Sequence, residues 1–199
     1  AQLRWDDTWG SAARDFDLLL YDAGVNLVAA SQDVQSGAAG HYPSEVFQYV
    51  APSTGAYYLA IGHFSGAVPS WLHMGILTGQ NLSVAVAATS VGNPAESANT
   101  GMLAVGAADW RTPDTIESFS SRGPTTDGRT KPDIVGADRG DSVSYGALGF
   151  PGTSQASPHV AGLAALVAQQ FPDLTPAQVA DYLKANALPR DAVPNDTWG

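Results

Sequence analysis

The chain has 199 residues, which is enough for one ordinary domain or two small ones. Hydrophobic residues make up 44% of it and charged residues 14%, a profile of folded rather than disordered proteins. The formal net charge of −10 disfavours nucleic acid and anionic membranes as partners, and the lack of cysteine excludes disulfides, thiolate metal sites and a cysteine nucleophile.

Residues 1–88 are predicted to form an all-β domain. Short aromatic and β-branched runs alternate there with turn clusters such as 36–40 and 52–55. The runs cover residues 16–22, 25–31, 45–50, 57–62 and 71–77. Short strands at this spacing are typical of a β-sandwich, here of a jelly-roll-like kind.

Four aspartates cluster in the first of these segments: Asp6, Asp7, Asp15 and Asp17. Carboxylates and loop carbonyls are the ligands that calcium prefers in proteins. The four residues lack the regular spacing of a calcium-binding loop, and a solvated acidic rim explains them as well. A structural calcium ion is therefore an option that the sequence does not support.

Residues 89–199 combine strands and helices, as α/β proteins do. The runs 102–107 and 134–137 are short and apolar, which suits buried parallel strands. The run 160–168 is apolar around its whole circumference, so it predicts a fully buried helix, and it is too short to span a membrane. Thr175 and Pro176 predict the cap and the first position of a further helix.

The residues around Ser154 carry the main functional signal. Gly152 and Thr153 form a tight turn that delivers Ser154 to the start of the apolar helix. Pro158 supports this placement, because a proline cannot donate a hydrogen bond to the carbonyl group four residues back. At a helix start the serine hydroxyl is exposed and the nearby N–H groups lack intrahelical partners. These are the requirements for a serine nucleophile with half of an oxyanion hole.

Residues 152–162, GTSQASPHVAG, resemble the nucleophile motif of the subtilisin-like serine peptidases. Three further segments resemble the same family in the same order: MLAVGA at 102–107, SFSSRGP at 118–124 with KPDIV at 131–135, and VPNDTWG at 193–199. The resemblance covers residues 92–199 and implies the C-terminal part of the family's parallel-sheet domain. It implies a secreted endopeptidase with a polypeptide substrate, Ser154 as the nucleophile, Gly152 and Thr153 in its loop, and no cofactor for the chemistry.

The rest of the catalytic triad is missing from the sequence. A serine hydroxyl needs a histidine base, and a carboxylate orients that histidine. In this family both precede the serine, in H-G-T-H and D-[ST]-G motifs, and neither motif occurs here. The resemblance gives His159 a structural role, and His41, His63 and His73 lie in unrelated contexts. We therefore expect a nearly inactive fragment whose partner is the N-terminal part of the same peptidase or another copy of the chain.

Two residues look like missing members of the family's site but have simpler interpretations. Asp22 precedes Ala23 and Gly24, whereas the family has Ser or Thr after its catalytic Asp. The following run 25–31 predicts the return strand of a hairpin, so Asp22 is interpreted as a turn carboxylate. Asn93 follows a glycine, as the family's oxyanion-hole Asn does, but it lies too close to the run 102–107 and is interpreted as a loop residue.

Residues 3–7, 15–18 and 55–61 look like the small β-sandwich found beside or inside secreted peptidases, the pre-peptidase C-terminal type. This second resemblance implies a sandwich at residues 1–88 that is inserted in the peptidase domain, followed by peptidase sequence at 89–199.

Two alternatives to an endopeptidase stay open. The chain is a non-catalytic module or pseudopeptidase if its sandwich binds a protein or a glycan through aromatic side chains, although aromatic residues in strands more often form the core. The candidates for such a face are Trp5, Trp9, Trp71, Tyr57 and Tyr58. A serine hydrolase with a different triad is the other alternative, and the sequence nominates no base for it.

Overall fold

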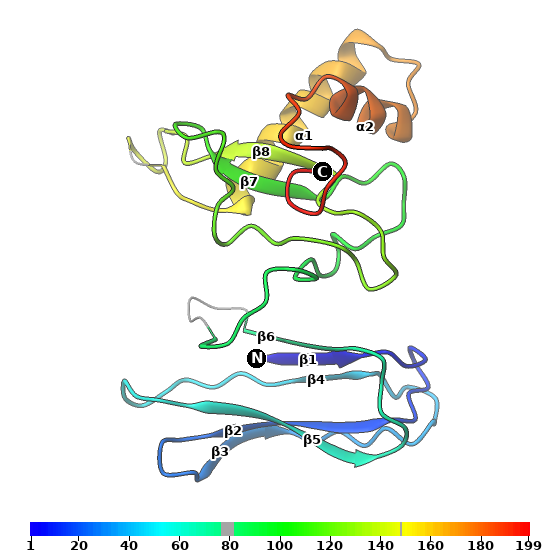
Figure 1. Cartoon of the computed structure of the whole chain (residues 1–199), viewed down its shortest axis with the longest axis vertical. Helices are drawn as coiled ribbons and strands as arrows, with labels where there is room; N and C mark the ends of the chain where they lie inside the picture. The colour runs from blue at the N-terminus through cyan, green and yellow to red at the C-terminus, as the bar shows by residue number, and fades with distance from the viewer. Residues whose placement is uncertain (77–81, 148) are drawn as a thin grey trace. The chain divides into compact units, whose positions relative to one another are not determined.

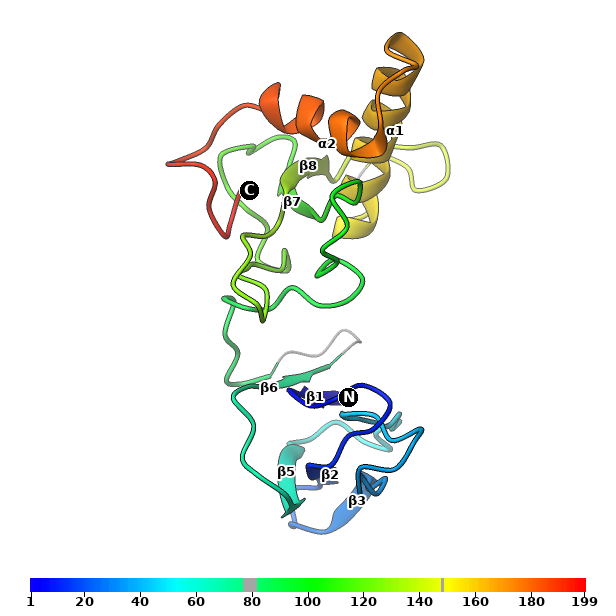
Figure 2. The same cartoon turned by 90° about the vertical axis from the view of Figure 1, so that its right-hand side faces the viewer.

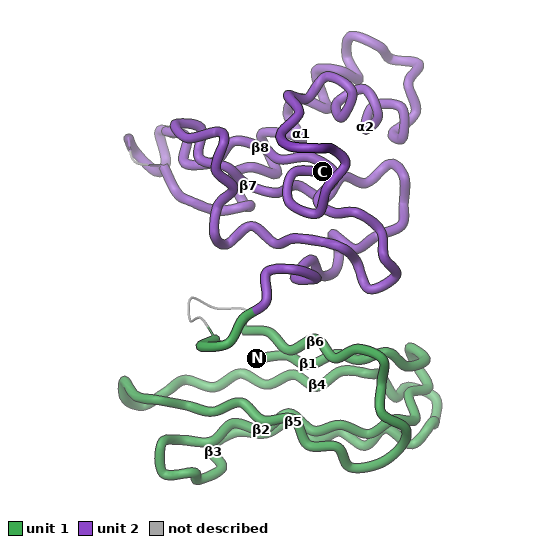
Figure 3. The backbone as a smooth tube through the Cα atoms, viewed as in Figure 1, with its two compact units in different colours: residues 1–85 green, residues 86–199 purple. Residues whose placement is uncertain are grey.

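The computed structural model describes residues 1–76, 82–147 and 149–199. The chain divides into two compact units, residues 1–85 and residues 86–199 (Figure 3). Together the described residues give a mixed α/β protein with small sheets and two helices, as the sequence predicts at that level. Among these residues, neither helix has the length and apolar character that crossing a bilayer requires.

The described residues of the first unit contain strands and no helix, and the strands are arranged as two antiparallel sheets with three strands each. The sheet orders are β4-β1-β6 and β3-β2-β5, and the two sheets lie as two layers (Figure 1). The strands are β1 (Gln2–Trp5), β2 (Asp15–Tyr21), β3 (Leu27–Ser31), β4 (Ser44–Val46), β5 (Tyr58–Ser65) and β6 (Leu72–Gly75).

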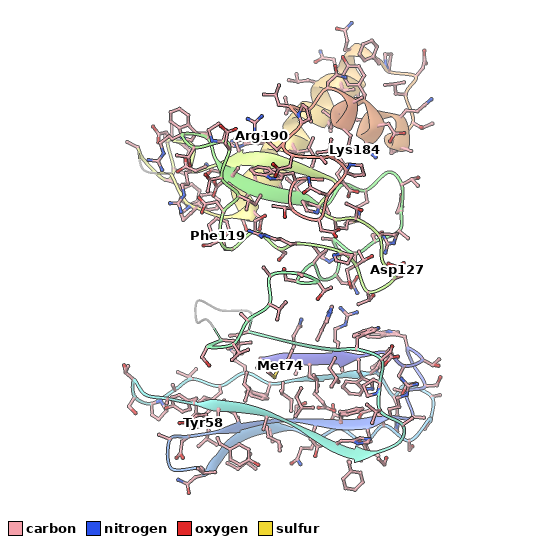
Figure 4. All side chains as sticks on the ribbon, in the orientation of Figure 1. Tyr58, Met74, Phe119, Asp127, Lys184 and Arg190 are labelled. Carbon is pink, nitrogen blue, oxygen red and sulfur yellow. The ribbon has the colours of Figure 1, made fainter. Side chains whose placement is uncertain are left out.

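The core of this unit comes from alternate residues of β1 and β2. Leu3, Trp5, Phe16 and Leu18 are all buried, and the Trp5 and Phe16 rings lie 5.3 Å apart between centroids. Figure 4 shows side chains filling the space between the two sheets, with Met74 of β6 among those that pack against the core. The period of two along each strand explains why one face is apolar.

β2 and β3 form the hairpin that the sequence predicts. At its turn the Asp22 carboxylate accepts hydrogen bonds from the N–H groups of Gly24 at 2.8 Å and Asn26 at 2.9 Å. The hydrogen bonds from Asn26 hold the pKa of Asp22 below its usual value. Asp22 is therefore a turn carboxylate, which confirms its simpler interpretation.

The second unit places α1 (Thr153–Gln170) against the parallel pair β7 (Val105–Asp109) and β8 (Ile134–Asp138), with α2 (Pro176–Ala185) packed on α1 (Figure 2). The parallel pairing of the two predicted strands is confirmed, from Val105 opposite Ile134 to Asp109 opposite Asp138. α2 begins as predicted, with Thr175 and Gln178 forming a capping box and Pro176 in the first turn.

The expectation that the apolar helix is fully buried is wrong for the described residues. Of α1, only Gln155, Ala156 and Val160 are buried, whereas Leu163 is 52% and Leu166 is 61% exposed. The run 160–168 is apolar on every side of the helix, but the described β7, β8 and α2 cover only part of its surface. An open groove of about 550 Å³ lies between α1, α2 and residues 101–105, and small side chains of α1 line much of it.

Candidate active site

The candidate nucleophile Ser154 is exposed and lies in the first turn of α1, directly after Thr153 at the helix start. The predicted place of Ser154 at the helix start is thus confirmed, but the expectation from Pro158 that Ser154 is itself the cap is wrong, because the N-cap is Gly152 and Pro158 lies inside α1. Gly152 is the N-cap residue, with φ 154° and ψ 151°, a backbone region that L side chains rarely adopt. The sequence needs a glycine there to turn the chain into the helix.

The backbone N–H groups at this helix start are free to bind a ligand. Gly152 has no side chain to cap the helix, and the Gly152 carbonyl accepts from the N–H groups of Gln155 at 2.9 Å and Ala156 at 3.3 Å. Among the described residues, nothing accepts a hydrogen bond from the N–H of Thr153 or of Ser154. Two donors and the positive end of the helix dipole thus lie beside the hydroxyl, which suits the binding of an oxyanion.

Asp138, at the carboxyl end of β8, binds the backbone of the turn that precedes Ser154. Its side chain is 0% exposed, and its Oδ2 atom accepts a hydrogen bond of 2.9 Å from the Gly152 N–H. Within the described part of the chain, Oδ1 has no hydrogen-bond donor. The sequence analysis missed this residue, although an acidic residue that directly follows a predicted buried strand is a signal for a site at the sheet edge.

Two further side chains of α1 connect it to the end of β8. The Gln155 amide accepts from the Gly140 N–H at 2.9 Å and donates to the Gly140 carbonyl at 2.7 Å. The His159 Nδ1 atom lies 2.8 Å from the Ala137 carbonyl oxygen, which requires the proton on Nδ1 because a carbonyl oxygen only accepts. His159 is exposed rather than buried, and its observed contact is with the backbone of β8.

Charged residues next to this edge pair with one another. Arg139 has φ 57°, and its guanidinium pairs with Glu117 and lies 3.7 Å from Asp109. The Glu117 carboxylate raises the pKa of Arg139, and the Arg111 side chain holds the pKa of Asp109 below its usual value. The neighbouring charges are therefore neutralised locally.

The other candidates from the sequence belong to other segments of the chain. His41, His63 and His73 belong to the first unit, as does Asp22, and Asn93 lies in an exposed turn of the second unit. In the described residues, no three His, Asp or Glu side chains gather in a way that holds a metal ion.

The acidic cluster of the first unit is occupied by donors of the protein. Asp7 accepts from the N–H groups of Thr8, Ala13 and Arg14 at 2.7 to 2.8 Å. Asp6 accepts from the Ser70 N–H at 2.8 Å and also pairs with Arg14. These contacts shape the loops around the cluster.

The aromatic residues proposed for a binding face are divided. Trp5 is 1% exposed and belongs to the core, whereas Trp9 is 63% exposed and its ring lies 5.1 Å from that of Tyr42. Tyr58 is 54% exposed on β5. Trp71 packs with His73, their ring centroids 5.1 Å apart.

Comparison with known proteins identifies a family and several relatives. Residues 78–199 match the model of the subtilase family. The serine protease AprX of Bacillus subtilis is 41% identical over 88 aligned residues, which cover 36% of this chain and 20% of that protein. Mycosin-1 of Mycobacterium tuberculosis is 42% identical over 77 residues, which cover 35% of this chain and 17% of that protein.

A third relative is the mouse membrane-bound transcription factor site-1 protease. It is 41% identical over 110 residues, which cover 49% of this chain and 10% of that protein. The chain thus matches a fifth or less of the length of each of these relatives.

Proposed function

This chain belongs to the subtilase family, and we propose that it carries the nucleophile of a serine endopeptidase, Ser154, on its nucleophile loop Gly152–Thr153–Ser154. The observation that carries the proposal is the exposed hydroxyl of Ser154 beside two free N–H groups at the start of α1. A hydroxyl in this position can attack a carbonyl carbon whose oxygen then points at the helix start.

The proposed chemistry is acyl transfer from a peptide bond. Ser154 Oγ attacks the scissile carbonyl carbon while an imidazole takes the hydroxyl proton, and the Ser154 N–H binds the oxyanion of the tetrahedral intermediate. The imidazole then donates its proton to the leaving amine. A serine, an imidazole and a carboxylate suffice for these steps, so the chemistry needs no cofactor.

We propose that the histidine and the aspartate come from polypeptide outside these residues, in the N-terminal part of the same peptidase. Another copy of the chain has the same sequence, so it is proposed only as a partner that supplies strands to this unit. The sequence has no H-G-T-H or D-[ST]-G motif, and the observed hydrogen bond of His159 goes to Ala137. The triad works as a unit, so this chain alone is expected to be nearly inactive.

The exposed apolar surface of α1 supports a partner for this unit. Leu163 and Leu166 are more than half exposed and belong to the apolar run 160–168 of this helix. Burial of such side chains is worth about 1.5–3 kcal/mol each. We propose that the polypeptide that supplies the histidine and aspartate also covers this helix.

The first unit is proposed to be a β-sandwich of the pre-peptidase C-terminal type, inserted at residues 1–88 ahead of peptidase sequence at 89–199. Its two antiparallel sheets around one apolar core support this assignment. We further propose a secreted enzyme that acts on polypeptides, in line with the chain's net charge of −10 and its similarity to subtilases.

A fluorophosphonate probe tests the proposal on this chain. The probe forms an Oγ–P bond and expels fluoride, and it needs an activated serine. We expect slow labelling of Ser154, and faster labelling when imidazole is added as a substitute base. Ser154→Ala should abolish the labelling, whereas Ser157→Ala, an exposed serine of the same helix, should not. Rapid stoichiometric labelling without imidazole means that the chain contains its own base. If added imidazole does not change the labelling rate of Ser154, the proposal is contradicted.

A further inference from the structure

The backbone at the nucleophile turn needs to be held in place. Gly152 has φ 154° and ψ 151°, in a region that is open essentially only to glycine. Such a conformation persists only where the surrounding structure fixes it. Even in glycine, the conformational freedom lost here must be offset by contacts with the turn.

The first such contact is the buried carboxylate of Asp138. It is 0% exposed and accepts the Gly152 N–H at 2.9 Å, while Oδ1 lacks a donor among the described residues. A buried carboxylate with one unpaired oxygen costs free energy. Stability alone therefore gives no reason for an aspartate here. Among the described residues, the carboxylate accepts its hydrogen bond from Gly152, the residue that sets the direction of the turn.

The second contact is the pair of hydrogen bonds between the Gln155 side chain and the Gly140 backbone. Gln155 is 7% exposed, and its amide makes one hydrogen bond in each direction with the Gly140 backbone, at 2.9 and 2.7 Å. Gln155 directly follows Ser154 in the sequence, and Gly152 lies two residues before Ser154. The segment that leaves β8 thus holds the turn on both sides of the serine.

We propose that Asp138 and Gln155 are positioning residues that together fix the direction of the Ser154 hydroxyl and N–H. This inference rests on the proposed function, because it assigns these residues a role through Ser154. Neither side chain touches the reacting atoms. A displacement of about 1 Å in a catalytic group can cost about 100-fold in rate, so the hold on the turn sets the rate of attack.

Amide hydrogen exchange on this chain tests directly whether Asp138 and Gln155 stabilise the turn. In Asp138→Ala the exchange protection of the Gly152 N–H should fall about 10- to 100-fold, the equivalent of one hydrogen bond to a charged group. Protection of the Phe171 N–H, which donates to Val167 at the far end of α1, should stay the same. Asp138→Asn keeps an acceptor oxygen and should retain most of the protection at Gly152.

The matched control is Asp109→Asn. Asp109 lies opposite Asp138 in the parallel pair, but its hydrogen bonds go to Arg111. This variant should leave Gly152 unchanged. If Asp138→Ala also leaves the Gly152 protection unchanged while the protein stays folded, the assignment of Asp138 is wrong.

Gln155→Met removes both bonds to Gly140 and keeps a side chain of similar length. It should lower the protection of the Gly140 N–H, whereas Gln169→Met, at an exposed position of the same helix, should not. Unchanged Gly140 protection in Gln155→Met overturns the second half of the proposal.

The imidazole-supported labelling of Ser154 is the functional readout. Asp138→Ala and Gln155→Met should each slow it about tenfold or more, and Asp138→Asn should restore much of the rate. If the variants change the exchange protection of the Gly152 N–H but not the labelling rate of Ser154, Asp138 and Gln155 only stabilise the fold. That result overturns the proposal. If the unaltered chain is never labelled at Ser154, the proposed peptidase function fails, and the exchange data still decide whether Asp138 holds the turn.

Discussion

Gly136 and Ala156 bring β8 and α1 into backbone contact, since a Cβ atom added at Gly136 would lie 2.7 Å from the Ala156 carbonyl oxygen. It would also lie 3.0 Å from Cγ2 of Val160. A larger residue at position 136 would push α1, and with it Ser154, away from the end of the strand.

Gly136→Ala should therefore destabilise the second unit by about 1–3 kcal/mol, the usual cost of overpacking. Gly162→Ala on α1 is the matched control, because nothing lies within 4 Å of a Cβ atom at that position. That control should stabilise the helix by about 0.5–1 kcal/mol, since glycine is a poor helix former. Urea unfolding of both variants gives the two signs, and equal effects would contradict the close packing of β8 on α1.

His159 should act through structure rather than as a base. His159→Ala removes the hydrogen bond to the Ala137 carbonyl, so the free energy of unfolding should fall by about 1 kcal/mol. The imidazole-supported labelling rate of Ser154, measured well below the unfolding transition, should change little. A loss of all labelling in folded His159→Ala would instead point to a catalytic imidazole at this position.

Helix starts and the burial of helix residues show what the sequence can and cannot predict. Thr175 with Pro176 marks the start of α2 because the chemistry of a cap and of a proline ring is local. Pro158 marks the start of α1 less well, because it lies inside the helix and the cap is Gly152. Burial depends on partners that a local pattern does not contain. The helix sequence therefore predicts an apolar surface correctly, but not that Leu163 is exposed in the described structure.

The contact that Asp138 makes with the nucleophile turn could not be predicted for the same reason, because it depends on tertiary packing. Asp138 follows a predicted strand, but its contact with Gly152 spans 14 positions and exists only once α1 packs on β8. In the first unit, β1 was not predicted, since its four residues give too short a pattern to identify alone. Its pairing with β4 and β6 on either side provides the missing stabilisation.

Glu45 should make the stability of the first unit depend on pH. It is 1% exposed, accepts from Gln35 Nε2 at 2.7 Å, and burial raises its pKa. An acid with a raised pKa in the folded state contributes most when protonated, so the free energy of unfolding should fall as the pH rises through this pKa.

Glu45→Gln lacks this titration, so its stability should change less over that pH range. Urea unfolding of both proteins between about pH 4 and pH 8, across the range where buried carboxyl groups titrate, gives the difference in slope. Parallel stability curves would show that Glu45 keeps its unfolded-state pKa.

The most direct measurement of the central claim is proteolysis by a chimera. Residues 86–199 of this chain would replace the corresponding part of the Bacillus subtilis serine protease AprX, a relative whose alignment at 41% identity covers 36% of this chain. The remainder of that protein would then provide the rest of the site. If Ser154 is the nucleophile, the chimera should cleave a polypeptide substrate, Ser154→Ala should abolish this cleavage, and Ser157→Ala should retain it. A folded chimera without activity, or one whose activity survives Ser154→Ala, would contradict it.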